Sequence, residues 1–228
     1  SSIKFKLRVI QMKKLLISEI FTSIQGESNY TGKVFFFIRL AVCNLDCSYC
    51  DTKYAFDKEK ASVLSINEIV EQAVRSGISL VEITGGEPLL QKNVLSLCDE
   101  LIENGLTVLM ETNGSLLISD INPKVTRIID CKCPSSGESG KMNFDNFSYM
   151  SANDEVKFVL VNEEDYIYAK SVISRHKLAN ITQKILFSPV LGKLEPKLLS
   201  KWMIRDKSSA RLQLQLHKII WPAIAKGV

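Results

Sequence analysis

The chain has 228 residues, enough for one globular domain, and its 46% hydrophobic and 24% charged residues are typical of soluble globular proteins. A formal net charge of +4 is too small to indicate nucleic-acid binding, and no apolar run approaches the length of a membrane span. We therefore expect a cytoplasmic protein that binds neither nucleic acid nor membrane.

The beginning of the chain is basic, with Lys4, Lys6, Arg8, Lys13 and Lys14 close together, as in a solvated leader. We predict an N-terminal leader at 1–15 and a single domain at 16–228. Met12 is a candidate natural start, in which case residues 1–11 would not belong to the native chain.

Strand-length apolar runs follow the leader and alternate with helical patterns. The predicted strands are Val34–Ala41, Leu80–Thr84, Leu106–Glu111, Thr126–Asp130, Val156–Val161 and Lys184–Ser188. A strictly alternating segment, Arg211–Leu216, predicts one more strand near the C-terminus.

Four helices are predicted between and after these strands. Ser65 and Glu68 have the spacing of a capping box, and the helix that they begin should end at Gly77. Further helices are expected over Asn93–Asn104, from Glu163 and from Pro196. Strand–helix alternation predicts a parallel sheet, and about six strands are too few to close an eight-stranded barrel. We expect an α/β fold, an incomplete (β/α) barrel of about six parallel strands.

Polar and glycine-rich motifs follow four of the predicted strands. They are a cysteine-rich loop after Ala41 and the segments Thr84–Pro88, Thr112–Gly114 and Lys132–Ser136. Because the carboxyl ends of parallel strands meet on one face, these motifs should build a single site.

The most informative motif is the spacing C-x3-C-x2-C, formed by Cys43, Cys47 and Cys50. Three thiolates in one short loop can hold three corners of a cubane iron–sulfur cluster. The fourth iron is then open to a ligand that the protein does not supply. Such an open site suits chemistry rather than electron storage alone.

The cysteines fit a structural zinc site or disulfide bonds less well than an iron–sulfur cluster. A structural zinc site needs four ligands, usually in paired knuckles, and Cys131 and Cys133 are too closely spaced to form one. The only histidines are His176 and His217. Disulfides are not expected, because nothing marks the chain as secreted. Cys98 lies on the apolar face of a helix, where it should be a buried small hydrophobe.

The triplet resembles the signature of the radical S-adenosylmethionine (SAM) superfamily. Other motifs narrow the resemblance to the 7-carboxy-7-deazaguanine synthase family, from about Leu16 to the C-terminus. They are Gln25-Gly26-Glu27, Arg39, Asp51-Thr52, Thr84-Gly85-Gly86-Glu87-Pro88, Glu111-Thr112-Asn113-Gly114, Asp130-Cys131-Lys132-Cys133-Pro134-Ser135-Ser136 and Leu216-His217-Lys218-Ile219-Ile220-Trp221. Tyr49 stands where the family would have Trp, and Ser28 where it often has Gly.

The resemblance implies a radical SAM fold and a [4Fe-4S] cluster on Cys43, Cys47 and Cys50, whose open iron chelates SAM. The residues implied to bind SAM are Tyr49, Asp51, Gly85, Gly86, Glu87, Glu111, Asn113, Lys132 and Ser135. From the residues alone, a plain turn is the alternative at Gly85-Gly86, and it is the stronger interpretation at Asn113-Gly114.

The implied substrate is 6-carboxy-5,6,7,8-tetrahydropterin. The residues implied to bind it are Ile24, Gln25, Gly26, Glu27, Arg39 and Thr84. Arg39 lies in a very apolar strand, where a charge is costly unless it is paired. The substrate carboxylate would pair with it, and an internal ion pair with Glu27 is the alternative.

Thr52 follows directly after the last cluster cysteine and an aspartate. The resemblance implies that its hydroxyl binds Mg2+ together with substrate. Mg2+ takes few protein ligands and keeps water or substrate oxygens at its other positions. From sequence alone, a helix cap is the commoner use of such a threonine.

The implied reaction begins when the reduced cluster cleaves SAM to a 5′-deoxyadenosyl radical, which removes hydrogen from the pterin. The ring contracts and loses ammonia to give 7-carboxy-7-deazaguanine, so the enzyme is a carbon–nitrogen lyase of queuosine and 7-deazapurine biosynthesis. The resemblance also implies a homodimer and a flavodoxin- or ferredoxin-like electron donor. The alternatives are another radical SAM enzyme, such as a glycyl-radical activase, and a zinc-binding interaction module.

Overall fold

The computed structural model describes residues 13–221 and 227. Its strands are β1 (Lys14–Ile24), β2 (Val34–Leu40), β3 (Ser62–Ser65), β4 (Leu80–Gly85), β5 (Thr107–Thr112), β6 (Thr126–Asp130), β7 (Glu155–Leu160), β8 (Ile185–Pro189) and β9 (Arg211–Leu212). The α-helices are α1 (Ile66–Arg75), α2 (Val94–Glu103), α3 (Glu163–Arg175), α4 (Pro196–Arg205) and α5 (Leu216–Ile220). Short 3-10 helices lie in the loops between them.

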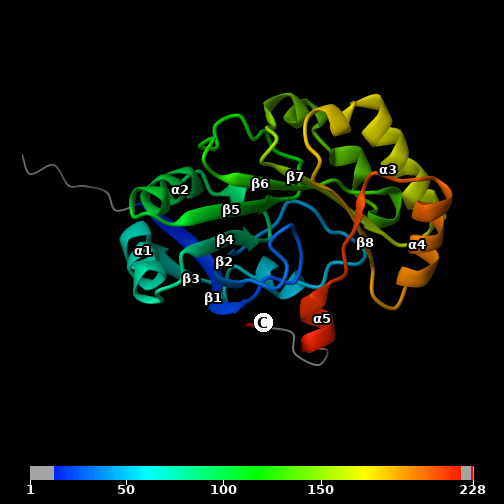
Figure 1. Ribbon diagram of the computed structural model, residues 1–228. Helices are drawn as coiled ribbons and strands as arrows, with labels where there is room; N and C mark the ends of the chain where they lie inside the picture. The colour runs from blue at the N-terminus through cyan, green and yellow to red at the C-terminus, as the bar shows by residue number, and fades with distance from the viewer. Residues whose placement is uncertain (1–12, 222–226, 228) are drawn as a thin grey trace, which may run out of the picture.

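These strands form one open sheet with the order β3-β1-β2-β4-β5-β6-β7-β8-β9. All neighbours from β2 to β9 are parallel, whereas β1 pairs antiparallel with β2 and β3. Figure 1 shows a curved sheet with α1–α4 along its outer side and α5 apart from them. The predicted incomplete (β/α) barrel is therefore confirmed.

The six predicted parallel strands correspond to β2 and β4–β8, each shifted by no more than one residue at either end. Helix α1 begins as predicted: Ser65 accepts a hydrogen bond from the backbone N–H of Glu68, and the Glu68 side chain accepts one from Ser65. Pro196 occupies the first turn of α4, also as predicted.

Two features near the chain ends differ from the predictions. Lys14 and Leu15, assigned to the leader, belong to β1, and Leu15 is buried against the core, so the domain includes them. The prediction about residues 1–11 lies outside the described residues. The late strand, predicted to reach Leu216, ends at Leu212. Beyond it Leu214 is exposed, and the Leu216 N–H donates to the Gly26 carbonyl instead of to the sheet.

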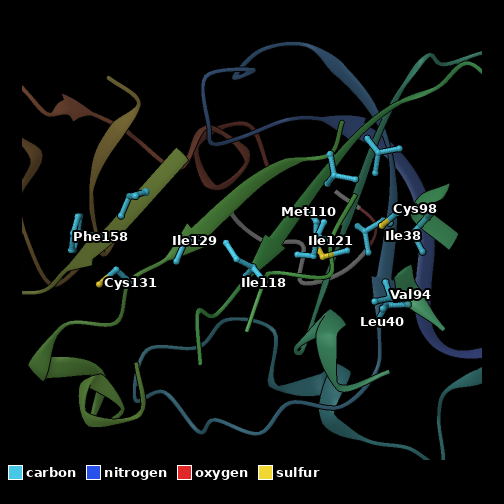
Figure 2. Close-up of a cluster of buried hydrophobic side chains, with 14 of the residues drawn as sticks. Ile38, Leu40, Val94, Cys98, Met110, Ile118, Ile121, Ile129, Cys131 and Phe158 are labelled. Carbon is cyan, nitrogen blue, oxygen red and sulfur yellow. The ribbon is translucent and has the colours of Figure 1, made fainter. Parts of the chain in front are cut away.

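Alternate residues along the parallel strands lie on opposite faces of the sheet. The outer face carries the main hydrophobic core, which combines strand residues such as Ile38, Met110, Ile129 and Phe158 (Figure 2) with residues of the helices. On the inner face, a smaller apolar cluster around Phe35 lies below a polar layer. Within the described part of the chain, none of the helices has the length and apolarity needed to cross a membrane.

Candidate active site

A cavity of about 450 Å³ opens on the inner face, at the carboxyl ends of the parallel strands. Every residue predicted to bind the cluster, SAM, Mg2+ or substrate lines this cavity, except Glu87 and Ser135. The predicted convergence of the strand-end motifs is therefore observed, and residues from β1 to α5 contribute to one space.

The cysteine triplet follows β2 in a loop that is tied to the segment after β6. The Ser48 side chain donates to the Ser135 carbonyl at 2.7 Å, and the Asp46 N–H donates to Glu138 at 2.9 Å. Ser135 thus lies beside the cysteine loop, although it does not line the cavity. Burial raises the pKa of the Cys47 thiol to about 11. A thiolate at this position therefore needs a cation, such as an iron ion, to compensate for its charge.

The backbone between β2 and the triplet is unusual. Val42 has φ of +77°, a rare conformation for a β-branched residue. Hydrogen bonds of 2.8 Å hold it at both ends: its N–H donates to Ala55, and its carbonyl accepts from the N–H of Glu87. A Cβ at Gly86 would overlap the Val42 carbonyl, and one at Gly85 would overlap the backbone of Leu40. The two glycines therefore allow the β4 loop to pack against the start of the cysteine loop.

Glu87 lies behind the cavity wall and is fully buried. Its carboxylate accepts hydrogen bonds from the N–H of Leu89 at 3.0 Å, from the N–H of Asn113 at 2.7 Å and from the Thr112 hydroxyl at 2.9 Å. The Asn113 side chain in turn donates to Asn44 at 3.0 Å. The Glu87 carboxylate thus joins the loops after β4 and β5 from behind the cavity wall.

Arg39 is paired inside the protein, but with a partner that the sequence did not suggest. Its Nε donates to Glu19 of β1 at 2.7 Å, and Tyr54 donates its hydroxyl to the same carboxylate oxygen. The predicted alternative, an ion pair with Glu27, is wrong. Glu19 was missed because its strand was not recognised. Arg39 also lines the cavity beside Thr84, its neighbour in the sheet.

Glu27 instead pairs with Lys157 of β7, whose Nζ lies 2.6 Å from Glu27 Oε2. Burial acts to raise the pKa of Glu27, but the Lys157 ammonium, together with His217 and Gln215, lowers that pKa to about 2. Lys157 also pairs with Glu111, and Lys132 pairs with Asp130 at 2.7 Å. Lys157 was missed by the sequence analysis, although a lysine inside a predicted buried strand carries the same signal as Arg39.

Gln25 bridges two carboxyl groups on the inner face. Its side-chain oxygen accepts from the Glu27 N–H at 2.9 Å, and its amide nitrogen donates to Glu82. Glu82 is buried in β4. Burial, and then the nearby Glu111, raise the pKa of Glu82 well above its ordinary value. Gln25 therefore links an ionised carboxylate of the wall, Glu27, to a carboxyl group that favours the neutral form, Glu82.

Thr52 occupies the N-cap position of the short 3-10 helix Lys53–Phe56, as the helix-cap alternative predicted, but its side chain makes no cap hydrogen bond. Its hydroxyl donates to Asp51 at 2.9 Å, and Lys218 pairs with Asp51 at 2.5 Å. Burial acts to raise the pKa of Asp51, but Lys218, together with Thr52 and His217, lowers that pKa to about 2.

The C-terminal segment completes the wall. Gln215 donates to Glu27 at 2.8 Å, and the Leu216 N–H donates to the Gly26 carbonyl at 2.9 Å. His217 lies so close to Gly26 that a Cβ there would overlap its ring. Gln215 and His217 were not predicted as site residues, although His217 belongs to the C-terminal motif that supported the resemblance.

Comparison with known proteins agrees with this geometry. Residues 37–127 match the Radical SAM superfamily. The chain is 44% identical to the 7-carboxy-7-deazaguanine synthase of Chlorobaculum tepidum, over 94% of this chain and 97% of the relative. It is 38% identical to the Koribacter versatilis protein of that name, over 93% and 99%. The chain belongs to the 7-carboxy-7-deazaguanine synthase family. The crystal structure of QueE from Escherichia coli has the same fold, with a TM-score of 0.74 at 23% identity over 90% of this chain and 95% of that one.

Membership of this radical SAM family implies a [4Fe-4S] cluster and SAM. The cysteines fit that requirement. Cys43, Cys47 and Cys50 line the cavity, whereas Cys98, Cys131 and Cys133 are fully buried in the hydrophobic core. Three thiols that line one cavity match, in number and type, the donors that a cluster with an open iron needs.

Proposed function

We propose that this protein converts 6-carboxy-5,6,7,8-tetrahydropterin to 7-carboxy-7-deazaguanine with loss of ammonia. This is a carbon–nitrogen lyase step in the biosynthesis of queuosine and related 7-deazapurines. The observation that carries the proposal is that three thiols share one cavity of about 450 Å³ with Arg39, Gln25 and Glu27. A cavity of this size, with a few convergent polar groups, is typical of small-molecule sites.

Cys43, Cys47 and Cys50 would hold the cluster, and SAM would complete it. Together these groups supply the carbon radical that removes hydrogen from the substrate, while the protein orients the reactants and excludes water. The backbone around Gly86 and the side chains of Glu111, Asn113 and Lys132 would orient SAM. Tyr49 and Asp51 lie on the same cavity wall as the thiols.

The substrate end of the cavity would recognise both parts of the pterin. Arg39 uses Nε for Glu19, so its Nη groups are the donors that we assign to the substrate carboxylate. Glu27 is ionised and Gln25 lies beside it, which gives acceptors for the donor-rich pyrimidine edge of the ring. Ile24, Gly26 and Thr84 would complete the contact.

Thr52 would bind Mg2+ through its hydroxyl oxygen, with water and substrate oxygens in the other positions. Thr52 lines the cavity and its hydroxyl makes no cap hydrogen bond to the following helix, which supports this assignment. We further propose a cytoplasmic, reducing location, a homodimer and a flavodoxin- or ferredoxin-like electron donor, all carried over from the family resemblance.

The deciding experiment is anaerobic incubation of the reconstituted protein with SAM, a reductant, Mg2+ and 6-carboxytetrahydropterin. We expect 7-carboxy-7-deazaguanine and ammonia in equal amounts, identified by mass spectrometry and an ammonia assay. Cleavage of SAM without conversion of the pterin would indicate a different radical SAM enzyme, such as a glycyl-radical activase. Zinc without iron or acid-labile sulfide would indicate a zinc-binding module.

A further inference from the structure

Lys157 is a buried cation to which the proposed function assigns no role. Its side chain is 7% exposed, and its neighbours in β7, Val156 and Phe158, pack into the outer core. Val159, the next inner-face residue of the strand, lines the cavity as Lys157 does. An ammonium group in such a place is costly unless carboxylates surround it, so its partners indicate why it is there.

Three carboxylates from separate parts of the chain approach the Lys157 ammonium. Glu27 follows β1 and lies 2.6 Å away, Glu111 is in β5 and pairs with it directly, and Asp130 ends β6 at 3.8 Å. Asp130 has a closer cation in Lys132 at 2.7 Å. Among the described residues, Lys157 is the only cation that pairs with both Glu27 and Glu111.

Other charges nearby make this cation hard to replace. Glu82 lies close enough to Glu27 and Glu111 for their charges to raise its pKa. Two other basic groups nearby do not take its place. Arg39 pairs with Glu19, and burial lowers the pKa of His217, which favours the neutral imidazole. Without Lys157, Glu27 and Glu111 would repel each other and the neutral form of each would be favoured.

We propose that Lys157 is a positioning residue that holds Glu27 and Glu111 together and so couples the binding of the pterin to the binding of SAM. The inference rests on the proposed function, which assigns Glu27 to the pterin and Glu111 to SAM. A ligand that fixes one carboxylate also fixes the ammonium, and thereby the other carboxylate. Such coupling is reciprocal: each ligand tightens the binding of the other by the same factor.

The first test measures this coupling by calorimetry on the cluster-loaded protein without reductant. SAM and 6-carboxytetrahydropterin are titrated alone and in the presence of the other. We expect wild-type protein to bind each at least about 5-fold more tightly when the other is present. Lys157→Met should reduce that factor below about 2-fold, while Lys157→Arg, which keeps the charge, should recover part of it. Lys184→Met is the matched control, since the Lys184 ammonium donates to the Asn153 backbone carbonyl and forms no salt bridge within the described part of the chain.

The second test needs neither ligand. Infrared spectra at pH 7 should show an additional protonated-carboxyl band in Lys157→Met, because Glu27 loses the cation that keeps it ionised. This additional band is measured as a difference from wild type, where neutral Glu82 already contributes a protonated-carboxyl signal. It should be absent from Lys184→Met, and it should disappear in the double variant Lys157→Met/Glu27→Gln. If Lys157→Met does not fold, Lys157→Gln replaces it in both tests.

The outcomes separate this inference from the proposed function. Wild-type coupling that persists unchanged in Lys157→Met, or a wild type that binds both ligands without coupling, overturns the inference. An unchanged infrared spectrum also overturns it. If wild-type protein binds SAM but not the pterin, the proposed function fails, and the infrared result still decides whether Lys157 controls the ionisation of Glu27.

Discussion

The two faces of the central sheet are built from the same strands but have opposite chemistry. In β2, Ile38 and Leu40 are buried in the outer core, whereas Arg39 between them lines the cavity. In β7, Phe158 packs outward, and Lys157 next to it lies among carboxylates. A shift of one residue along a strand therefore separates a side chain that stabilises the fold from one that is available for binding.

The inner face is not simply polar. Phe35, Phe37, Leu109 and Ile128 form an apolar layer on it, and the charged residues lie nearer the carboxyl ends of the strands. Buried charges are tolerated there because each has an opposite partner from another strand or loop. The comparison predicts that outer-face changes affect stability and that inner-face changes affect binding. The following experiments test that separation.

The largest effect should come from the cysteines, which divide between the faces. Cys43→Ala removes a proposed cluster ligand and should abolish cluster assembly, whereas wild type should hold about four irons per chain after anaerobic reconstitution. Cys131→Ala, in the outer core, should keep the iron and lose only about 1 kcal/mol of stability. Iron and sulfide analysis checks this, and full iron in Cys43→Ala with loss in Cys131→Ala would reverse the assignment.

Truncation of an outer-face aromatic should be the next largest effect. Phe158→Ala should lower the free energy of unfolding by about 3–5 kcal/mol, because it leaves a cavity in a closely packed core. Val159→Ala, its inner-face neighbour on the cavity wall, should cost less, about 1–2 kcal/mol. Urea denaturation of both variants provides the comparison. Equal losses would show that the two faces contribute equally to stability.

Arg39→Ala should weaken substrate binding by about 2–5 kcal/mol, the cost of removing one partner of a desolvated charge pair. Reductive cleavage of SAM without substrate should remain largely intact. Glu19→Gln is the matched control, since it removes the internal partner of Arg39 but leaves the guanidinium in place. We expect a smaller loss of pterin affinity in this variant. A loss equal to that of Arg39→Ala would instead assign the ion pair a structural role.

Glu27 should make the stability of the protein depend on pH at the acidic end. Its folded pKa of about 2 lies below the ordinary 4.5, so its contribution is fully present above pH 4.5 and is lost as pH falls toward 2. The full contribution is about 3 kcal/mol, of which about 2 kcal/mol should disappear by pH 3. The difference in unfolding free energy between wild type and Glu27→Gln, measured from pH 6 to pH 3, should show this loss. Parallel pH profiles would contradict it.

The smallest expected effect concerns Mg2+. Because Mg2+ retains water until better oxygens replace it, turnover should rise with added Mg2+, and Mg2+ should tighten substrate binding about 5-fold or more. Thr52→Ala should remove most of this dependence without changing cluster content, and Thr52→Ser should retain much of it. Turnover is measured against Mg2+ concentration in metal-stripped buffer. Full wild-type activity without a divalent ion would exclude the assignment.

The sequence by itself determined the parallel strands, the capping box of α1 and the cysteine spacing, because these depend on patterns within a few residues. Periodicity identified β2 and β4–β8 to within one residue, and the position of the motifs after strand ends indicated one site. It also marked Arg39 as a charge that needs a partner.

Only the tertiary structure decided which partners meet. Glu19 pairs with Arg39 through an antiparallel strand that periodicity did not reveal, and Lys157 pairs with Glu27 across 130 positions of sequence. Position 86 needs a glycine because a Cβ there would overlap the Val42 backbone in the adjacent loop. The Glu87 carboxylate accepts a hydrogen bond from the Asn113 N–H, in the loop after β5. Such contacts depend on the curvature and order of the sheet, which bring distant segments together, and no local pattern encodes the distance between them.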